Sequence, residues 1–170
     1  KGLKRLCEEA EQAVDEGCNY IILSDRGVDA KNAPIPALLA TSAVHHRLIH
    51  KKKRTQTALV VETADAREVM HFALLAGYGA SAINPYLAFS VLDDLVKKKE
   101  IQLDTRTAIN NFIKAVDKGL LKVMSKMGIS TLTSYKGAQL FEAIGLSEET
   151  CHKYFGNTVS KIGGIGLGGM

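Results

Sequence analysis

Short apolar runs alternate with amphipathic segments along this chain, and this alternation constrains the fold more than any other feature of the sequence. The run at 20–23 is continuously apolar, which is typical of a strand buried on both faces of a parallel sheet. Between the runs, apolar residues recur at helical spacing. The predicted strands span 20–23, 58–61, 80–83 and 129–132. The predicted helices span 3–14, 36–50, 65–76, 86–98, 109–127, 134–144 and 147–155.

Strands that alternate with helices predict βα units and a parallel sheet. Right-handed crossovers of this kind build either a doubly wound sheet or a (β/α)8 barrel. A complete barrel needs roughly 200 to 250 residues, whereas this chain has 170. The predicted fold class is therefore α/β, with alternating βα units and a parallel sheet that resembles a partial (β/α)8 barrel.

The composition, with 46% hydrophobic and 24% charged residues, is that of an ordinary globular domain. Its longest near-apolar stretch, 72–78, is much shorter than the roughly 18 residues of a membrane-spanning helix, so we expect no membrane contact. The net charge of +4 comes largely from basic clusters at 51–54 and 97–99, where predicted helices end. Cations there complement the helix dipole, and no aromatic residues interleave with them, so we expect no nucleic-acid binding.

The cysteine and histidine patterns do not predict a metal site. Cys7, Cys18 and Cys151 have no Cys-x-x-Cys spacing, which indicates reduced thiols in a reducing compartment. His46 and His50 lie four residues apart, close enough on one helix face to chelate a metal. Their neighbours are cationic and the glutamate of the zincin pattern is missing, so we expect no metal.

Polar residues follow each predicted strand at its carboxyl end, where ligands bind in parallel α/β folds. The candidates for contact with a ligand or a channel are Ser24, Asp25, Arg26, Glu62, Asn84 and Lys126. Asp25 and Glu62 form a carboxylate pair for acid and base chemistry if their strands are neighbours. The alternative is that Arg26 or Arg67 pairs with them in a purely structural role, and Lys126 is a candidate cation at a helix end.

The last ten residues, 161–170, are rich in glycine. Gly164 and Gly166 resemble the start of a dinucleotide fingerprint, but that motif needs a following helix and an acidic residue about 20 positions later. We therefore interpret 161–170 as a glycine-rich tail or connector, and 1–160 as one unit.

Several long segments resemble the glutamate synthase family, in the large-subunit or single-chain form of the enzyme. The segments that carry the resemblance are ILSDR at 22–26, PIPALLATSAVHH at 34–46, EVMHFALL at 68–75, GYGA at 77–80, AINPYLA at 82–88, KGLLKVMSKMGIST at 118–131, SYKGAQLFE at 134–142 and SKIGG at 160–164. They follow the family's order and cover nearly the whole chain. The resemblance places residues 1–160 in the C-terminal part of the central domain.

The resemblance implies that this chain is an interior section of an enzyme that forms two glutamates from glutamine and 2-oxoglutarate by amide transfer and reduction. It implies FMN and an iron-sulfur cluster for the parent enzyme, none of them bound by this section, and no catalytic residue in it. The implied role is packing against the amidotransferase and FMN-binding domains and a share of the ammonia tunnel. A separate reducing subunit is a further implied partner, and the implied location is the cytoplasm or a plastid.

Two other expectations accompany this resemblance. The alternative function is a free-standing α/β enzyme that binds a phosphorylated ligand or flavin at the carboxyl ends of the strands. A partial array of βα units leaves strand edges and apolar helix faces uncovered, so the isolated chain is expected to associate with itself.

Overall fold

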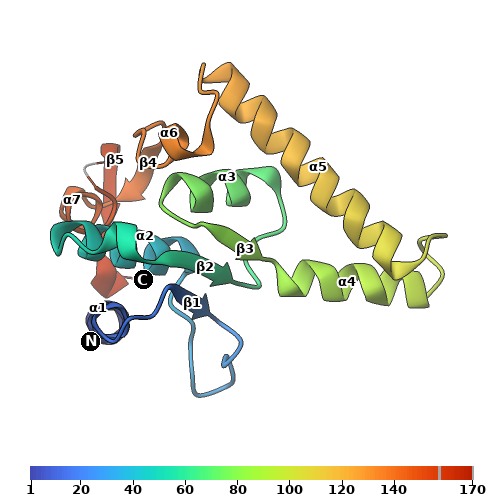
Figure 1. The fold of residues 1–170 in the computed structure, drawn as a ribbon, viewed down its shortest axis with the longest axis horizontal. Coiled ribbons are helices and arrows are strands. Elements are labelled where there is room, and N and C mark those ends of the chain that lie inside the picture. Colours follow the sequence, from blue (N-terminus) through green and yellow to red (C-terminus); the bar gives the residue numbers. More distant parts are fainter. Residues whose placement is uncertain (157, 170) are drawn as a thin grey trace.

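A computed structural model describes residues 1–156 and 158–169, and in that range the chain is an α/β protein (Figure 1). The helices are α1 (Gly2–Asp15), α2 (Ala37–His50), α3 (Val69–Gly77), α4 (Tyr86–Lys97), α5 (Thr105–Lys126), α6 (Leu132–Tyr135) and α7 (Glu148–Tyr154). The strands are β1 (Tyr20–Ser24), β2 (Ala58–Glu62), β3 (Ala82–Asn84), β4 (Glu142–Leu146) and β5 (Val159–Ile165). All strand pairs are parallel, which confirms the predicted fold class at this level.

The first sheet has the order β1-β2-β3, and among the described residues only one face of β1 is buried. Ile21, Leu23 and Leu59 point into the core with residues of α1 and α2. Their neighbours on the other face are exposed, with Tyr20 at 73% and Ile22 at 65%. The prediction of strands buried on both faces is therefore wrong for β1. A continuous apolar run indicates a strand with apolar side chains on both faces. The described residues bury only one of these faces.

The start of α3 differs from the sequence prediction, which placed it at Asp65. The helix begins at Val69, and Glu68 and His71 exchange side-chain to backbone hydrogen bonds in a capping box. Asp65 instead accepts a weak 3.4 Å hydrogen bond from the backbone N–H of Ala37. This hydrogen bond joins the loop after β2 to the start of α2. The residue that caps α3 is therefore Glu68 and not Asp65.

Helices α4 and α5 form a hairpin that extends away from the first sheet, as Figure 1 shows. Asp104 caps α5 by accepting a 2.9 Å hydrogen bond from the N–H of Thr107. The basic clusters lie at helix ends as predicted, since Lys51 is the C-cap of α2 and Lys98 the C-cap of α4.

The segment after α5 contradicts the sequence prediction. No strand forms at 129–132, because the Thr131 side chain accepts a hydrogen bond from the N–H of Ser134 and starts the short helix α6. The predicted helix over 134–144 is also absent, since the chain leaves α6 after Tyr135 and forms β4. Gly137 has a φ of 72° and donates its N–H to the carbonyl of Gly77 at 2.8 Å, which directs the chain toward α3.

A second, two-stranded sheet joins β4 to β5 around α7. The helix predicted to start at 147 forms as α7, and Ser147 caps it by accepting a hydrogen bond from the N–H of Thr150. The first five residues of the glycine-rich tail, 161–165, lie in β5, so the predicted boundary at 160 falls within a strand. Whether 161–170 acts as a connector stays a prediction. Among the described residues, every helix is too short or too polar to cross a membrane.

Candidate functional site

The first sheet brings three predicted site residues together at the carboxyl ends of its strands. The register pairs Ser24 with Glu62, and Glu62 with Asn84. Because side chains alternate between the faces of a strand, these three share a face with Tyr20 and Ile22, the open face of the sheet. We call Ser24, Glu62 and Asn84, together with Asp25 and Arg26, the polar rim.

Glu62 is the centre of the polar rim. Its carboxylate accepts a 2.6 Å hydrogen bond from the Ser24 hydroxyl and a 3.2 Å hydrogen bond from the Asn84 amide. Arg26 completes the group with a 2.7 Å ion pair from Nε. Hydrogen bonds from Ser24 and Arg26 lower the pKa of Glu62, so this carboxylate is ionised at neutral pH.

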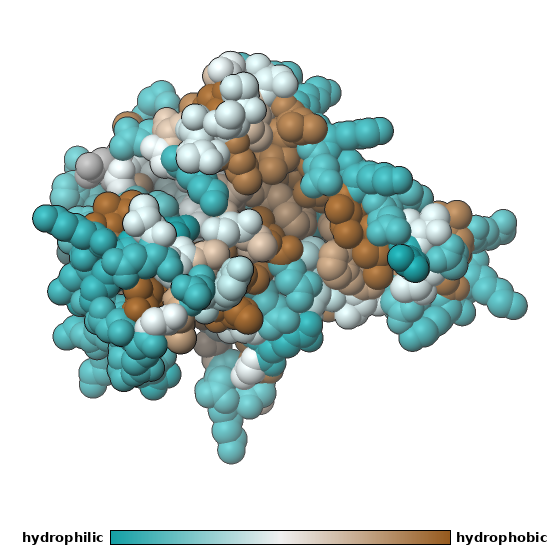
Figure 2. Space-filling view, viewed as in Figure 1, coloured by the Kyte–Doolittle hydropathy of each residue, from teal (hydrophilic) through white to brown (hydrophobic). Residues whose placement is uncertain are grey.

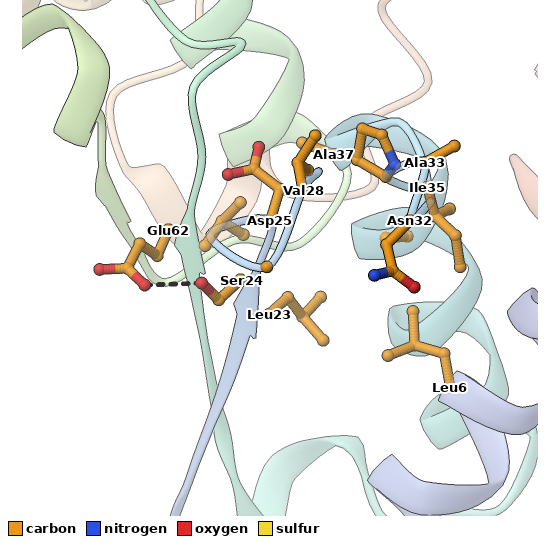
Figure 3. A pocket seen from close by; sticks show the side chains of 14 residues that line it. Leu6, Leu23, Ser24, Asp25, Val28, Asn32, Ala33, Ile35, Ala37 and Glu62 are labelled. Atoms are coloured by element: carbon orange, nitrogen blue, oxygen red, sulfur yellow. Dashed lines mark hydrogen bonds between the residues drawn. The ribbon is translucent and has the colours of Figure 1, made fainter. Parts of the chain in front are cut away.

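Asp25 is held separately from Glu62. Burial by itself raises the pKa of Asp25, but hydrogen bonds from the Thr63 hydroxyl (2.7 Å) and the Ala64 N–H (3.0 Å) outweigh it and lower the pKa. Figure 3 shows the carboxylates of Asp25 and Glu62 pointing away from each other. Of the expected ion pairs, the described residues show only the one between Arg26 and Glu62, whereas Asp25 is held by hydrogen bonds from Thr63 and Ala64.

Tyr86 is a rim residue that the sequence prediction missed. The Arg26 guanidinium lies 4.1 Å from the centre of the Tyr86 ring, a cation–π contact. The interaction of Tyr86 with the Asp25 carboxylate raises the pKa of its phenol. Tyr86 comes two residues after the end of β3, and Ser24, Asp25, Arg26, Glu62 and Asn84 also end or follow a strand. This position is the sequence signal by which Tyr86 could have been found.

A cavity of about 250 Å3 lies beside the polar rim, between α1, the end of β1 and the start of α2 (Figure 3). Its walls are mostly apolar and include Leu6, Leu23, Val28 and Ile35. The loop above it is held by Asp29, whose carboxylate accepts hydrogen bonds from the N–H groups of Lys31 and Asn32.

Lys126 lies apart from the polar rim. It is the last residue of α5, is exposed, and makes no hydrogen bond or ion pair with any described residue of the rim. Figure 1 shows the C-terminal end of α5 beside α6, at the opposite end of that helix from the hairpin with α4. The polar rim thus unites five of the six predicted site residues, and the functional role of each stays a prediction.

The described residues do not fit an iron-sulfur cluster, and the polar rim does not fit the phosphate of a flavin. Cys7 and Cys151 lie on different helices and Cys18 is exposed between elements, so no set of thiolates converges. No group of three potential metal-ligating side chains occurs among the described residues. At the polar rim, the ionised Asp25 and Glu62 oppose binding of a phosphate by charge repulsion.

These observations define a class: an α/β protein whose parallel strands end in an ionised hydrogen-bond network and whose sheet is open on one face. The lowered pKa values of both rim carboxylates leave neither with a proton to donate near neutral pH, which argues against a general-acid role for either one.

Comparison with known proteins gives the family. A family model described as the glutamate synthase central domain matches residues 1–147, and this chain belongs to that family. It is 46% identical to the large chain of an NADPH glutamate synthase of Bacillus subtilis and 50% identical to an NADH glutamate synthase of Schizosaccharomyces pombe. These matches cover 98% and 96% of the chain but 11% and 8% of the relatives. A chloroplastic ferredoxin-dependent glutamate synthase of Spinacia oleracea is 45% identical over 98% of the chain and 11% of its own length.

Proposed function

We propose that this chain is an interior section of a glutamate synthase that forms two glutamates from glutamine and 2-oxoglutarate. In this proposal the section packs between the amidotransferase and FMN-binding domains and supplies part of the wall along which ammonia travels. FMN and the iron-sulfur cluster belong to other parts of the parent chain, and this section contributes no catalytic residue. The chain spans about a tenth of the length of the relatives that it matches, which supports this role.

The observation that carries the proposal is the open face of the first sheet. Its side chains form successive rows across the strands, apolar where Tyr20 and Ile22 stand and polar at the row of Ser24, Glu62 and Asn84. In a (β/α)8 barrel the face of the strands opposite the helices is the interior one. An exposed apolar interior face indicates that other parts of the parent chain cover it, and a partial (β/α)8 arrangement completed by those parts agrees with this face.

Apolar surface is also exposed on the side of the α4–α5 hairpin. Figure 2 shows apolar residues gathered between α5 and the body of the molecule. A cavity of about 310 Å3 lies there, lined by Phe72, Phe89, Phe112 and Leu120 among others. Contiguous apolar hollows of this kind are typical of surfaces that pack against another domain, which supports a position between domains.

The polar rim suits the passage of ammonia without chemistry. Ammonia donates hydrogen bonds, and the ionised Glu62 and the Asn84 carbonyl oxygen are acceptors on the open face. Since the rim carboxylates are ionised, a proton is not transferred from them to the passing molecule. The rim therefore guides ammonia and leaves it as a nucleophile for the reaction at the next domain.

The test is a block in the middle of the open face. In the full-length enzyme, Val60→Trp fills the row between Ile22 and Ala82, whereas the matched control Leu121→Trp adds the same ring to an exposed site on α5. Glutamine hydrolysis, glutamate formation and free ammonia are measured together. The proposal expects Val60→Trp to keep glutamine hydrolysis, lower glutamate formation and release ammonia. Unchanged coupling in a folded Val60→Trp enzyme contradicts the tunnel role.

The alternative, a free-standing enzyme that binds a phosphorylated ligand or flavin at the polar rim, receives one supporting observation, the 250 Å3 cavity beside Asp25. The negative charge of the rim opposes it. A fluorescence titration of FMN with this chain separates the two functions, because saturable quenching at micromolar concentration supports flavin binding and its absence supports the structural role.

A further inference from the structure

A cavity of about 270 Å3 lies at the other end of the strands from the polar rim, between the end of α2 and the loop after α6. His45, His46 and His50 of α2 line one side, and the segment that follows Tyr135 lines the other. None of the described residues that line it is an aspartate or a glutamate. The described walls of the cavity therefore carry no acidic side chain.

The partly buried side chain of Arg54 lies beside His45, one of the residues that line this cavity. Its guanidinium donates to the carbonyl oxygens of Thr57 (2.7 Å) and Gly79 (2.8 Å) and to Nδ1 of His45 (2.8 Å). These bonds use three of the five N–H groups of an arginine. Burial lowers the pKa of Arg54, and no described carboxylate lies within ion-pair distance of it.

The acidic residues near α2 are engaged elsewhere. Glu11 pairs with Arg47 at 2.7 Å and with Lys51 at 3.4 Å, and Asp15 pairs with Lys53 at 2.6 Å. These contacts lie on the side of α2 that faces α1. The charge of Arg54 is consequently balanced by carbonyl dipoles alone among the described residues.

A second cation increases this imbalance. Lys136 is half-buried, and burial and the nearby Arg54 charge lower the pKa of its ammonium group. Burial lowers the pKa of His45 to about 3, and the nearby charge of Arg54 contributes to this shift. His45 is therefore neutral, and since its Nδ1 accepts from Arg54, its proton is on Nε2.

Two partly buried cations without a carboxylate are costly, because an ionised group outside water needs a counter-charge. We propose that three residues form a binding site for a small oxyanion, a phosphate or a carboxylate, beside this cavity: His45 of its wall, Arg54, which is bonded to His45, and Lys136, which lies between the lining residues Tyr135 and Gly137. Arg54 and Lys136 supply the charge, Arg54 offers its remaining N–H groups, and Nε2–H of His45 is a neutral donor. The site is separate from the polar rim and does not depend on the proposed tunnel.

The test is hydrogen exchange of individual peptides in the full-length protein that carries this chain, so that other anion sites are read separately. Inorganic phosphate and malonate are compared with chloride at equal ionic strength, on peptides that cover 50–57 and 132–141. With a Kd of about 1 mM, phosphate at about 10 mM slows exchange by local opening about tenfold. Slowing by phosphate alone identifies a phosphate site, and slowing by malonate alone identifies a carboxylate site.

Lys136→Met is the test variant, and Lys118→Met is its matched control, since Lys118 is an exposed lysine on α5. The proposal expects Lys136→Met to abolish the slowing, Lys136→Arg to keep it and Lys118→Met to leave it unchanged. The peptide over 105–120 reports whether each variant is folded. Three results would overturn the proposal. The first is an equal effect of chloride and the oxyanions, and the second is no effect of either oxyanion on the wild type. The third is slowing that persists in folded Lys136→Met.

Discussion

Ser24 and Glu62 stand at paired positions at the ends of β1 and β2, and the Ser24 hydroxyl donates a 2.6 Å hydrogen bond to the Glu62 carboxylate. This contact joins residues 38 positions apart in the chain. It exists because the parallel register aligns the last residues of the two strands. It also leaves Glu62 as an acceptor shared by Ser24, Arg26 and Asn84, and not as a free base.

Stability should depend on the ionised state of Asp25. The pKa of Asp25 is lowered in the folded protein, so its contribution is complete above its unfolded value near 4 and is lost as the pH falls through the folded pKa. We expect Asp25→Asn to cost about 1 kcal/mol at pH 7, with a difference from wild type that shrinks below pH ~4. Urea unfolding at several pH values measures this. A difference that stays constant with pH contradicts the role of charge.

The cluster between α1, α2 and the first sheet should tolerate truncation poorly. Leu48 is fully buried in this cluster, whereas its neighbour Ile49 is 47% exposed. We expect Leu48→Ala to lower the free energy of unfolding by about 2 to 5 kcal/mol. Ile49→Ala is the matched control and should change it by less than about 1 kcal/mol. Chemical denaturation measures the free energy of unfolding of both variants. Similar losses for the two would show that α2 does not bury Leu48 in preference to Ile49.

Gly79 should accept no side chain. Its φ is 116°, and a Cβ there would collide with the imidazole ring of His45. Gly17 has a φ of 88° but open space around it, so a substitution there causes backbone strain without a collision. We expect Gly17→Ala to cost about 1 kcal/mol and Gly79→Ala about 3 kcal/mol or more. Thermal unfolding compares the two, and equal costs would mean that His45 moves aside freely.

Self-association of the isolated chain should depend on the open face of the first sheet. Tyr20 and Ile22 expose apolar surface there, next to the open edge of β1. We expect the chain to form dimers or larger species at high concentration, and Ile22→Lys to shift it toward the monomer. Met70→Lys, on α3 at 58% exposure, carries the same change outside this face and should have little effect. Light scattering across a concentration series decides between these outcomes.

The local pattern predicted most of the elements up to Lys126, because helical and strand periodicity is a property of neighbouring residues. It failed at 129–144, where α6 ends at Tyr135 and the backbone N–H of Gly137 bonds to Gly77, some 60 positions earlier. It failed again at Asp65, whose contact with Ala37 no local signal contains. Long-range hydrogen bonds decided both places.

By itself, the sequence determined the α/β class, the strand-end position of Ser24, Glu62 and Asn84, and the resemblance to glutamate synthases, since each depends on residue types in order. Only the tertiary structure decided that Arg26 pairs with Glu62, that Asp25 and Glu62 turn apart, and that one face of the sheet is open. The physical reason is that pairing and burial depend on register and on which helices cover a strand. The sequence of an apolar strand indicates that its side chains are to be buried. Which helices or domains bury them depends on the tertiary structure.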